Sequence, residues 1–325
     1  MIRSILFFCL FACTPLWANK TGITIDPQAP KEWPRSTRVE PGFEVKVIKE
    51  DAATNTYVYQ TPHFEFHSDA KLMVSLVRDF SLIFESTLLA VKNNPLGLNP
   101  RMGEPRYQVK LFKNREDYLA DGGMKGSAGI YMGSRKQILV PLESLNVRIQ
   151  GKSATRGKGG DNDTLVHEIT HQVMHDWLRY LPMWCVEGMA EYMRAIPYRN
   201  GIFNCSRISP KEYAQNLKSF VPLSKLMRIS NQEWSEAVAD STGHDNYLST
   251  GLLCYYFIHL DGKGDGARFK AFLKKLSETG NYDEAEKVLL DNRTLAQVED
   301  ELKNAFKKKE RMELGGTKSG QPRKP

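Results

Sequence analysis

The stretch that decides the fold and the chemistry of this chain is residues 164–194, TLVHEITHQVMHDWLRYLPMWCVEGMAEYMR. It contains the pattern H-E-x-x-H at His167, Glu168 and His171. Residues four apart share one face of a helix, so His167 and His171 can present two imidazole nitrogens to one metal ion. Glu168 lies beside them, where its carboxylate can take a proton from a metal-bound water. The pattern therefore indicates a metal-dependent hydrolase.

Two packed helices are predicted around this pattern. The second begins near Met183 or Trp184, because Pro182 must break the first. It carries Glu187 and Glu191 one turn apart, so packing the helices can bring Glu187 to the two histidines. Three protein ligands leave a fourth position for water, as a catalytic zinc site requires. The first helix is amphipathic, with an inward-facing set of apolar residues: Leu165, Ile169, Val173 and Trp177.

The stretch also contains a histidine and a cysteine, residue types that can bind metal, outside the predicted ligand set. His175 is one more four-residue step after His171, but it has no flanking acid, so it is expected to line or pack the helix. Three cysteines follow residue 18, namely Cys185, Cys205 and Cys254, which excludes a disulfide-dense framework. Cys185 is predicted to be a buried core residue or half of a bridge to Cys205.

HEITH followed by WCVEGMAEY resembles the gluzincin metallopeptidases, which include thermolysin and the membrane alanyl aminopeptidases. The closest likeness is to the bacterial peptidase MA-like proteins. The resemblance implies that His167, His171 and Glu187 bind one zinc ion and that Glu168 is the general base. It also implies that Glu191 orients His167 through the other ring nitrogen.

A looser likeness covers FKNREDYLADGG and AGIYM before the motif and YLSTGLLCYYFIHLDG after it. It implies that AGIYM is an edge strand that pairs with an extended substrate backbone. A tetrahedral oxyanion needs a further donor, for which Tyr247 is the candidate and His244 the alternative. The G-A-M-E-N exopeptidase strand of the aminopeptidases is absent, which argues against aminopeptidase specificity.

The predicted fold class is α+β and zincin-like, in one domain over residues 51–310. An αβ half with a small mixed sheet covers 51–160, the zinc helices 161–195, and a mostly helical half 196–310. Within the first half we expect strands in 56–66 broken at Pro62, a helix over 70–92 capped by Ser68 or Asp69, a strand over 107–112, a helix over 115–120, a hairpin at Gly133-Ser134 and a flexible loop over 151–162. Helices are expected downstream at 210–217, 230–238, 247–260, 267–276, 282–289 and 295–309.

The two ends of the chain have different compositions. Residues 1–18, with Arg3 before an apolar run, are typical of a secretory signal peptide cleaved after Ala18. Lipidation of Cys13 is a minority alternative. An exported protein follows, periplasmic or secreted, with a flexible leader over 19–50 and a disordered basic tail over 311–325.

Charge and hydropathy exclude several classes of partner. The net charge is +7, but residues 306–325 alone hold seven Lys or Arg and two Glu, so the body is close to neutral. No nucleic-acid partner is therefore indicated. No stretch after the signal is apolar for long enough to cross a membrane.

The sequence thus predicts an exported zinc metallopeptidase acting on a peptide or protein substrate. One alternative is a non-catalytic binding or scaffold protein with the same fold, against which the intact Glu168 argues. A zinc hydrolase of another amide or ester is the second alternative. Substrate, endo- or exopeptidase action and oligomeric state are left open.

Overall fold

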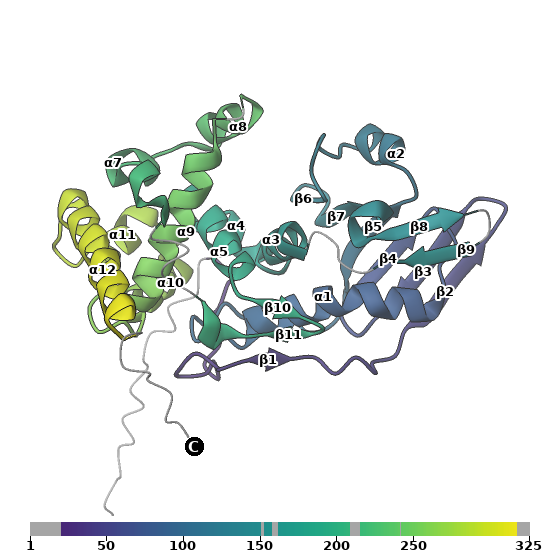
Figure 1. Ribbon diagram of the computed structural model, residues 1–325, viewed down its shortest axis with the longest axis horizontal. Helices are drawn as coiled ribbons and strands as arrows, with labels where there is room; N and C mark the ends of the chain where they lie inside the picture. The colour runs from purple at the N-terminus through teal and green to yellow at the C-terminus, as the bar shows by residue number, and fades with distance from the viewer. Residues whose placement is uncertain (1–20, 151–152, 158–161, 209–214, 241, 317–325) are drawn as a thin grey trace, which may run out of the picture.

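The computed structural model describes residues 21–150, 153–157, 162–208, 215–240 and 242–316 (Figure 1). The fold is mixed α+β, as predicted, with about half of the chain helical. A sheet-bearing part and a helical part flank three central helices (Figure 1). The expected signal peptide, 1–18, lies outside the described residues.

The main sheet has six described strands in the order β2-β3-β4-β5-β7-β6. β4, β5 and β7 run parallel, and the other neighbours pair antiparallel. The break at Pro62, the strand over 107–112 and the hairpin at Gly133-Ser134 are confirmed, and β6 forms one edge. The strands are β2 Lys46–Asp51, β3 Thr56–Gln60, β4 Phe64–Ser68, β5 Tyr107–Phe112, β6 Ile130–Met132 and β7 Gln137–Pro141, with α2 (Arg115–Ala120) between β5 and β6.

Helix α1 (Val74–Lys92) packs on this sheet through aromatic contacts. The ring centroid of Phe84 lies 5.5 Å from that of Phe64 and 5.2 Å from that of Phe66. These rings are fully buried, so the contact anchors the helix by apolar burial.

The predicted start of this helix, at residue 70 with a Ser68 or Asp69 cap, is wrong. β4 continues to Ser68, whose hydroxyl donates to the carbonyl of Ala70. The Asp69 carboxylate accepts the backbone N–H of Lys113 instead of a helix N–H. Tertiary partners therefore take both cap candidates, and the helix begins at Val74.

The structure also differs from the expected flexible segments. Residues 21–50, predicted to be a leader, contain β1 (Thr37–Arg38) and β2 and bury Ile23. β1 pairs with β11 (Ile202–Phe203), which in turn pairs with β10 (Tyr198–Arg199). The loop predicted over 151–162 includes β9 (Ser153–Arg156), paired with β8 (Val147–Gln150), although 151–152 and 158–161 lie outside the described residues.

The second half is mostly helical, as predicted. Its α8 begins after Ser230, which forms a capping box with Glu233. The predicted helix over 210–217 corresponds in part to η3, while 209–214 lie outside the described residues. α12 runs to Gly316, beyond the predicted end and into the segment expected to be disordered; 317–325 are not described. The elements are η1 Leu142–Leu145, η2 Cys205–Arg207, η3 Gln215–Ser219, α7 Leu223–Leu226, α8 Asn231–Ala239, α9 His244–His259, α10 Ala267–Thr279, α11 Tyr282–Leu290 and α12 Leu295–Gly316.

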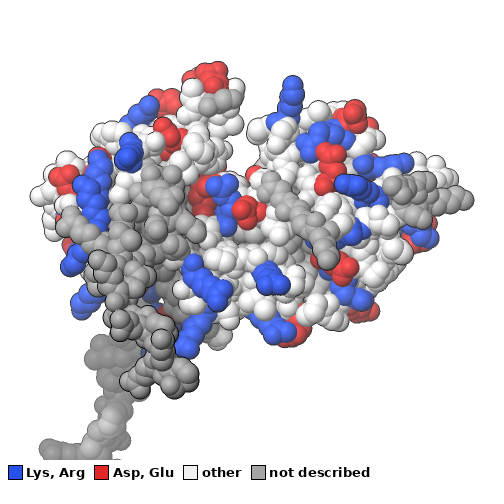
Figure 2. All heavy atoms as spheres, viewed as in Figure 1, with Lys and Arg blue, Asp and Glu red and all other residues white. Residues whose placement is uncertain are grey.

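Three central helices join the two halves: α3 (Asn162–Val173), α4 (His175–Leu178) and α5 (Met183–Arg194). α3 contacts α1 and α5, and α5 packs on α9. One continuous apolar core runs from the sheet through these helices into the second half. Figure 2 shows a notch in the surface between the sheet-bearing and helical parts, toward which the central helices face in the same view (Figure 1). Among the described helices, none has the length and hydropathy needed to cross a membrane.

Candidate metal centre

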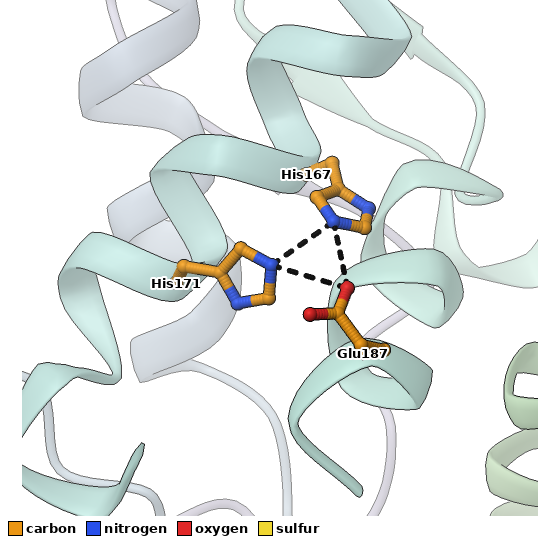
Figure 3. A group of neighbouring side chains, drawn as sticks. All are labelled: His167, His171 and Glu187. Atoms are coloured by element: carbon orange, nitrogen blue, oxygen red, sulfur yellow. Dashed lines mark hydrogen bonds and ion pairs between the residues drawn. The ribbon is translucent and has the colours of Figure 1, made fainter. Parts of the chain in front are cut away.

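Three side chains from α3 and α5 converge on one point (Figure 3). The Nε2 atoms of His167 and His171 lie 3.0 Å apart. Glu187 Oε2 lies 3.2 Å from the His167 nitrogen and 3.5 Å from the His171 nitrogen. Across the described part of the chain, this is the one group of three His, Cys, Asp or Glu whose ligand atoms all lie within 4.8 Å. The four-residue helical step and the start of α5 after Pro182 produce this convergence as predicted. The first helix is shorter than predicted: α3 ends at Val173, and Trp177 lies on the separate helix α4.

The donor atoms fit a divalent cation. Glu187 Oε2 is buried, and within the described residues it meets hydrogen-bond geometry with no group, although it contacts both imidazoles as an ion pair. A buried carboxylate oxygen without a hydrogen bond is costly, so it calls for a positive partner. Two imidazole nitrogens and one carboxylate oxygen are a ligand set typical of zinc.

The electrostatics of the three residues favour positive charge between them. Burial opposes protonation of His167, but its close contacts with the carboxylates of Glu187 and Glu191 outweigh burial and raise its pKa to about 10. Burial raises the pKa of Glu187, but the charge of His171 and the close contact of both imidazoles lower it well below its usual range. A proton on His167 supplies part of the positive charge that a bound cation would supply.

Glu191 lies where the resemblance predicts, on the other side of His167. Its Oε1 is 2.9 Å from His167 Nδ1, so it can hold this ring with Nε2 toward Glu187. Its Oε2 is 2.6 Å from an Arg194 guanidinium nitrogen. Arg194 is a further residue of the site that was not predicted, although its three-residue spacing from Glu191 on a helix indicates such a pair.

Glu168 touches the edge strand. Its Oε2 accepts the backbone N–H of Tyr131, on β6, at 2.7 Å. The Tyr131 hydroxyl lies 2.6 Å from His175 Nδ1. His175 therefore lies outside the metal cluster and binds the edge strand, consistent with the predicted lining role. Burial, then the charge of Lys136, lowers the pKa of His175.

Of the two predicted oxyanion donors, the structure brings Tyr247 to the cluster. Its ring centroid is 6.0 Å from that of His167 and 4.9 Å from that of Trp234 on α8. Burial and the nearby charge of Glu187 raise the pKa of Tyr247 well above its usual range, so the phenol keeps its proton. His244, at the start of α9, is exposed.

The three cysteines are free thiols. Cys185 is fully buried in the core, which is one of its two predicted environments. Burial and then the neighbouring thiol of Cys254 raise the pKa of Cys185, whereas Cys205 lies on η2.

No protein-family model matches this chain, and no curated protein matches it. The likeness of HEITH and WCVEGMAEY to the gluzincins therefore stays a prediction.

Proposed function

We propose that this chain is an exported, zinc-dependent metallopeptidase of the gluzincin type with a zincin-like fold. One observation carries the proposal: His167, His171 and Glu187 converge, and the buried Glu187 oxygen has no hydrogen-bond partner among the described residues. Glu168 follows the first of these ligands and offers a carboxylate that binds no other side chain in the described contacts. A purely structural metal site has no need of such a base.

His167, His171 and Glu187 would hold the zinc ion. When bound, zinc supplies Lewis acidity, which polarises a carbonyl and lowers the pKa of water. Glu191 and its ion pair with Arg194 keep His167 in one ring orientation and one tautomer.

Glu168 moves the proton. The Tyr131 N–H holds Oε2, which leaves Oε1 as the atom that accepts a proton from the attacking water. The same carboxyl then donates this proton to the leaving amine. Hydrogen bonding to rigid backbone fixes the carboxylate in place before substrate arrives.

Tyr247 donates a hydrogen bond to the oxyanion that develops on the scissile carbonyl. Its raised pKa keeps the hydroxyl protonated across the neutral range. An O–H donor in a half-buried position stabilises developing charge more strongly than one in water.

A peptide substrate fits the edge strand. Among the described strands, β6 pairs only with β7, so its other side can add an extended backbone. The Tyr131 N–H already binds Glu168, so this edge brings an extended chain next to the proposed base. The notch in Figure 2 gives the space between the two halves in which such a chain can lie.

The test compares wild type with Glu168→Gln, using Asp163→Asn as a matched control on an exposed acid of the same helix. Metal content is measured on each protein, together with cleavage of a proteome-derived peptide library. We expect about one zinc in all three, and a loss of cleavage of about 100- to 10,000-fold in Glu168→Gln alone.

Other outcomes separate the alternatives. A wild type that holds zinc and cleaves neither peptides nor other amides and esters would be a binding or scaffold protein. Hydrolysis of small esters or amides without any peptide cleavage would indicate the other zinc hydrolase. A wild type that binds no metal would exclude the peptidase and the other zinc hydrolase, and would leave the binding or scaffold protein.

A further inference from the structure

Two cysteines face each other in the interface between α5 and α9. Cys185 lies on α5, the helix that carries Glu187, and Cys254 lies on α9, the helix that carries Tyr247. Both are 0% exposed. After burial, the neighbouring Cys254 thiol is the next cause that raises the pKa of Cys185, so the two side chains lie close together.

Gly188 explains how these two helices come so close. A Cβ built at Gly188 would lie 2.6 Å from Cys254 Sγ and 2.6 Å from the Thr250 carbonyl oxygen, so the α9 backbone passes directly over this residue. Cys185 is one turn before Gly188 on the same face of α5, and Cys254 is one turn after Thr250 on α9. A disulfide needs Cα atoms about 4.4–6.8 Å apart, a separation that ordinary helix packing exceeds and that a glycine contact permits.

We infer that Cys185 and Cys254, which are both thiols in the structure described, are oxidised during folding to a disulfide that links α5 to α9. The oxidant is another disulfide, either a small molecule such as oxidised glutathione or a protein disulfide. One cysteine thiolate attacks the oxidant, forms a mixed disulfide and releases one thiol. The second cysteine thiolate attacks the cysteine sulfur of that mixed disulfide and releases the second thiol. The two cysteine protons end on the two released thiols, so atoms and electrons balance.

Burial fixes when this bond forms. Neither sulfur is accessible in the folded protein, so the exchange takes place before α9 closes on α5. Once formed, the bond is shielded from soluble thiols by the same core. It fixes the helix of a proposed zinc ligand relative to the helix of the proposed oxyanion donor, and it does not depend on either role.

Cys205 provides an internal control. It lies on η2, is only partly buried, and belongs to neither helix of the interface. Trypsin places these three cysteines on separate peptides: Cys185 on 180–194, Cys205 on 200–207 and Cys254 on 229–263. The other two cysteines of the full chain, Cys9 and Cys13, share peptide 4–20 and are mapped apart from them.

The test refolds the full chain in a mixture of reduced and oxidised glutathione, alkylates free thiols in denaturant, digests without reductant and maps the peptides by mass. We expect 180–194 linked to 229–263, lighter than the two free peptides by two hydrogen atoms, and 200–207 alkylated. The link should persist in Cys205→Ser. In Cys254→Ala, peptide 180–194 should be alkylated or carry glutathione.

Alkyl label on both 180–194 and 229–263 of the refolded wild type would overturn the inference. So would a link from either of them to 200–207. Because thiols are mapped in denaturant, neither result requires a variant to be stable. A protein that has this disulfide but no peptidase activity would support the inference and contradict only the proposed function.

Discussion

Glu191 connects the candidate metal centre to the surface of the protein. One of its oxygens lies 2.9 Å from His167 Nδ1, and the other lies 2.6 Å from Arg194, whose side chain is 39% exposed. A carboxylate held at both oxygens has little freedom to turn. It therefore fixes the orientation of the His167 ring, whose Nε2 faces Glu187.

Replacing Glu191 should weaken metal binding without removing a ligand. We expect Glu191→Ala to lower zinc affinity by about 10- to 100-fold, the usual cost of losing such a partner. Arg194→Ala should lower zinc affinity less, because the Glu191 carboxylate still contacts His167. Competition with a chelator measures both. Arg199→Ala, an exposed arginine on β10, should match wild type, and equal affinity in all four proteins would contradict the orienting role.

His175 should make stability depend on pH. Burial lowers its pKa below the ordinary value of 6.5, and its Nδ1 lies 2.6 Å from the Tyr131 hydroxyl. A histidine with a lowered pKa in the folded state contributes stability that is present above the unfolded pKa and is lost as pH falls through the folded pKa. Between about pH 7 and about pH 5, the free energy of unfolding should therefore fall more in wild type than in His175→Phe. Urea titrations at both pH values measure this, and His244→Phe, at an exposed histidine, should follow wild type.

The residues that could be predicted are those placed by local periodicity. The four-residue step of His167 and His171 and the start of α5 after Pro182 are enough to predict that Glu187 can reach them. The contacts of Tyr131 with Glu168 and His175 span 37 and 44 positions along the chain. No local pattern encodes them, because they arise only when β6, α3 and α4 are all in place.

At the scale of elements, the contact between α5 and α9 is the one on which the proposed site depends most. It joins the helix of Glu187 to the helix of Tyr247, and Gly188 sets their separation. Alanine is favoured over glycine inside a helix by about 1 kcal/mol, which alone would stabilise a variant. Here the added methyl meets a backbone carbonyl that cannot move aside easily.

We therefore expect Gly188→Ala to destabilise the protein. Overpacking costs about 1–3 kcal/mol and should outweigh the gain in helix propensity. Denaturant unfolding gives the change in free energy. Gly42→Ala is the matched control, because a Cβ there meets nothing within 4 Å, and it should be close to neutral. A Gly188→Ala protein as stable as wild type would mean that the two helices can separate at no cost.

Elements whose residues carry their own pattern were predicted well, and those defined by distant partners were not. The strand over 107–112 and the helix over 115–120 agree with the structure at both ends. β1 has only two residues and exists because Thr37 and Arg38 pair with Phe203 and Ile202. A composition rich in Pro, Lys and Thr gives no sign of that partner.

At the scale of the whole molecule, α3 and α5 lie between the sheet and the later helices and share one core with both. The proposed ligands belong to these two helices. A bound ion would therefore link α3 to α5 in the middle of a domain that unfolds as one cooperative unit.

Removing the ion should lower stability without splitting the unfolding transition. At a free zinc concentration of 100 times Kd, binding contributes about 2.7 kcal/mol. Calorimetry with and without a chelator should show one transition in each case, at a lower temperature for the metal-free protein. Glu187→Ala should show no effect of the chelator. Two separated transitions would contradict a single unit.

Thr21 has a consequence for the time course of biosynthesis. Its carbonyl accepts hydrogen bonds from Arg179 and Tyr180, and its hydroxyl donates to the carbonyl of Ser277, 256 residues later. The amino end of the chain leaves the ribosome first. Thr21 therefore cannot contact Ser277 until most of the polypeptide has been synthesised. Such long-range closure is slow compared with local helix formation. The contact between Thr21 and α10 therefore forms only after α10 has emerged, late in synthesis.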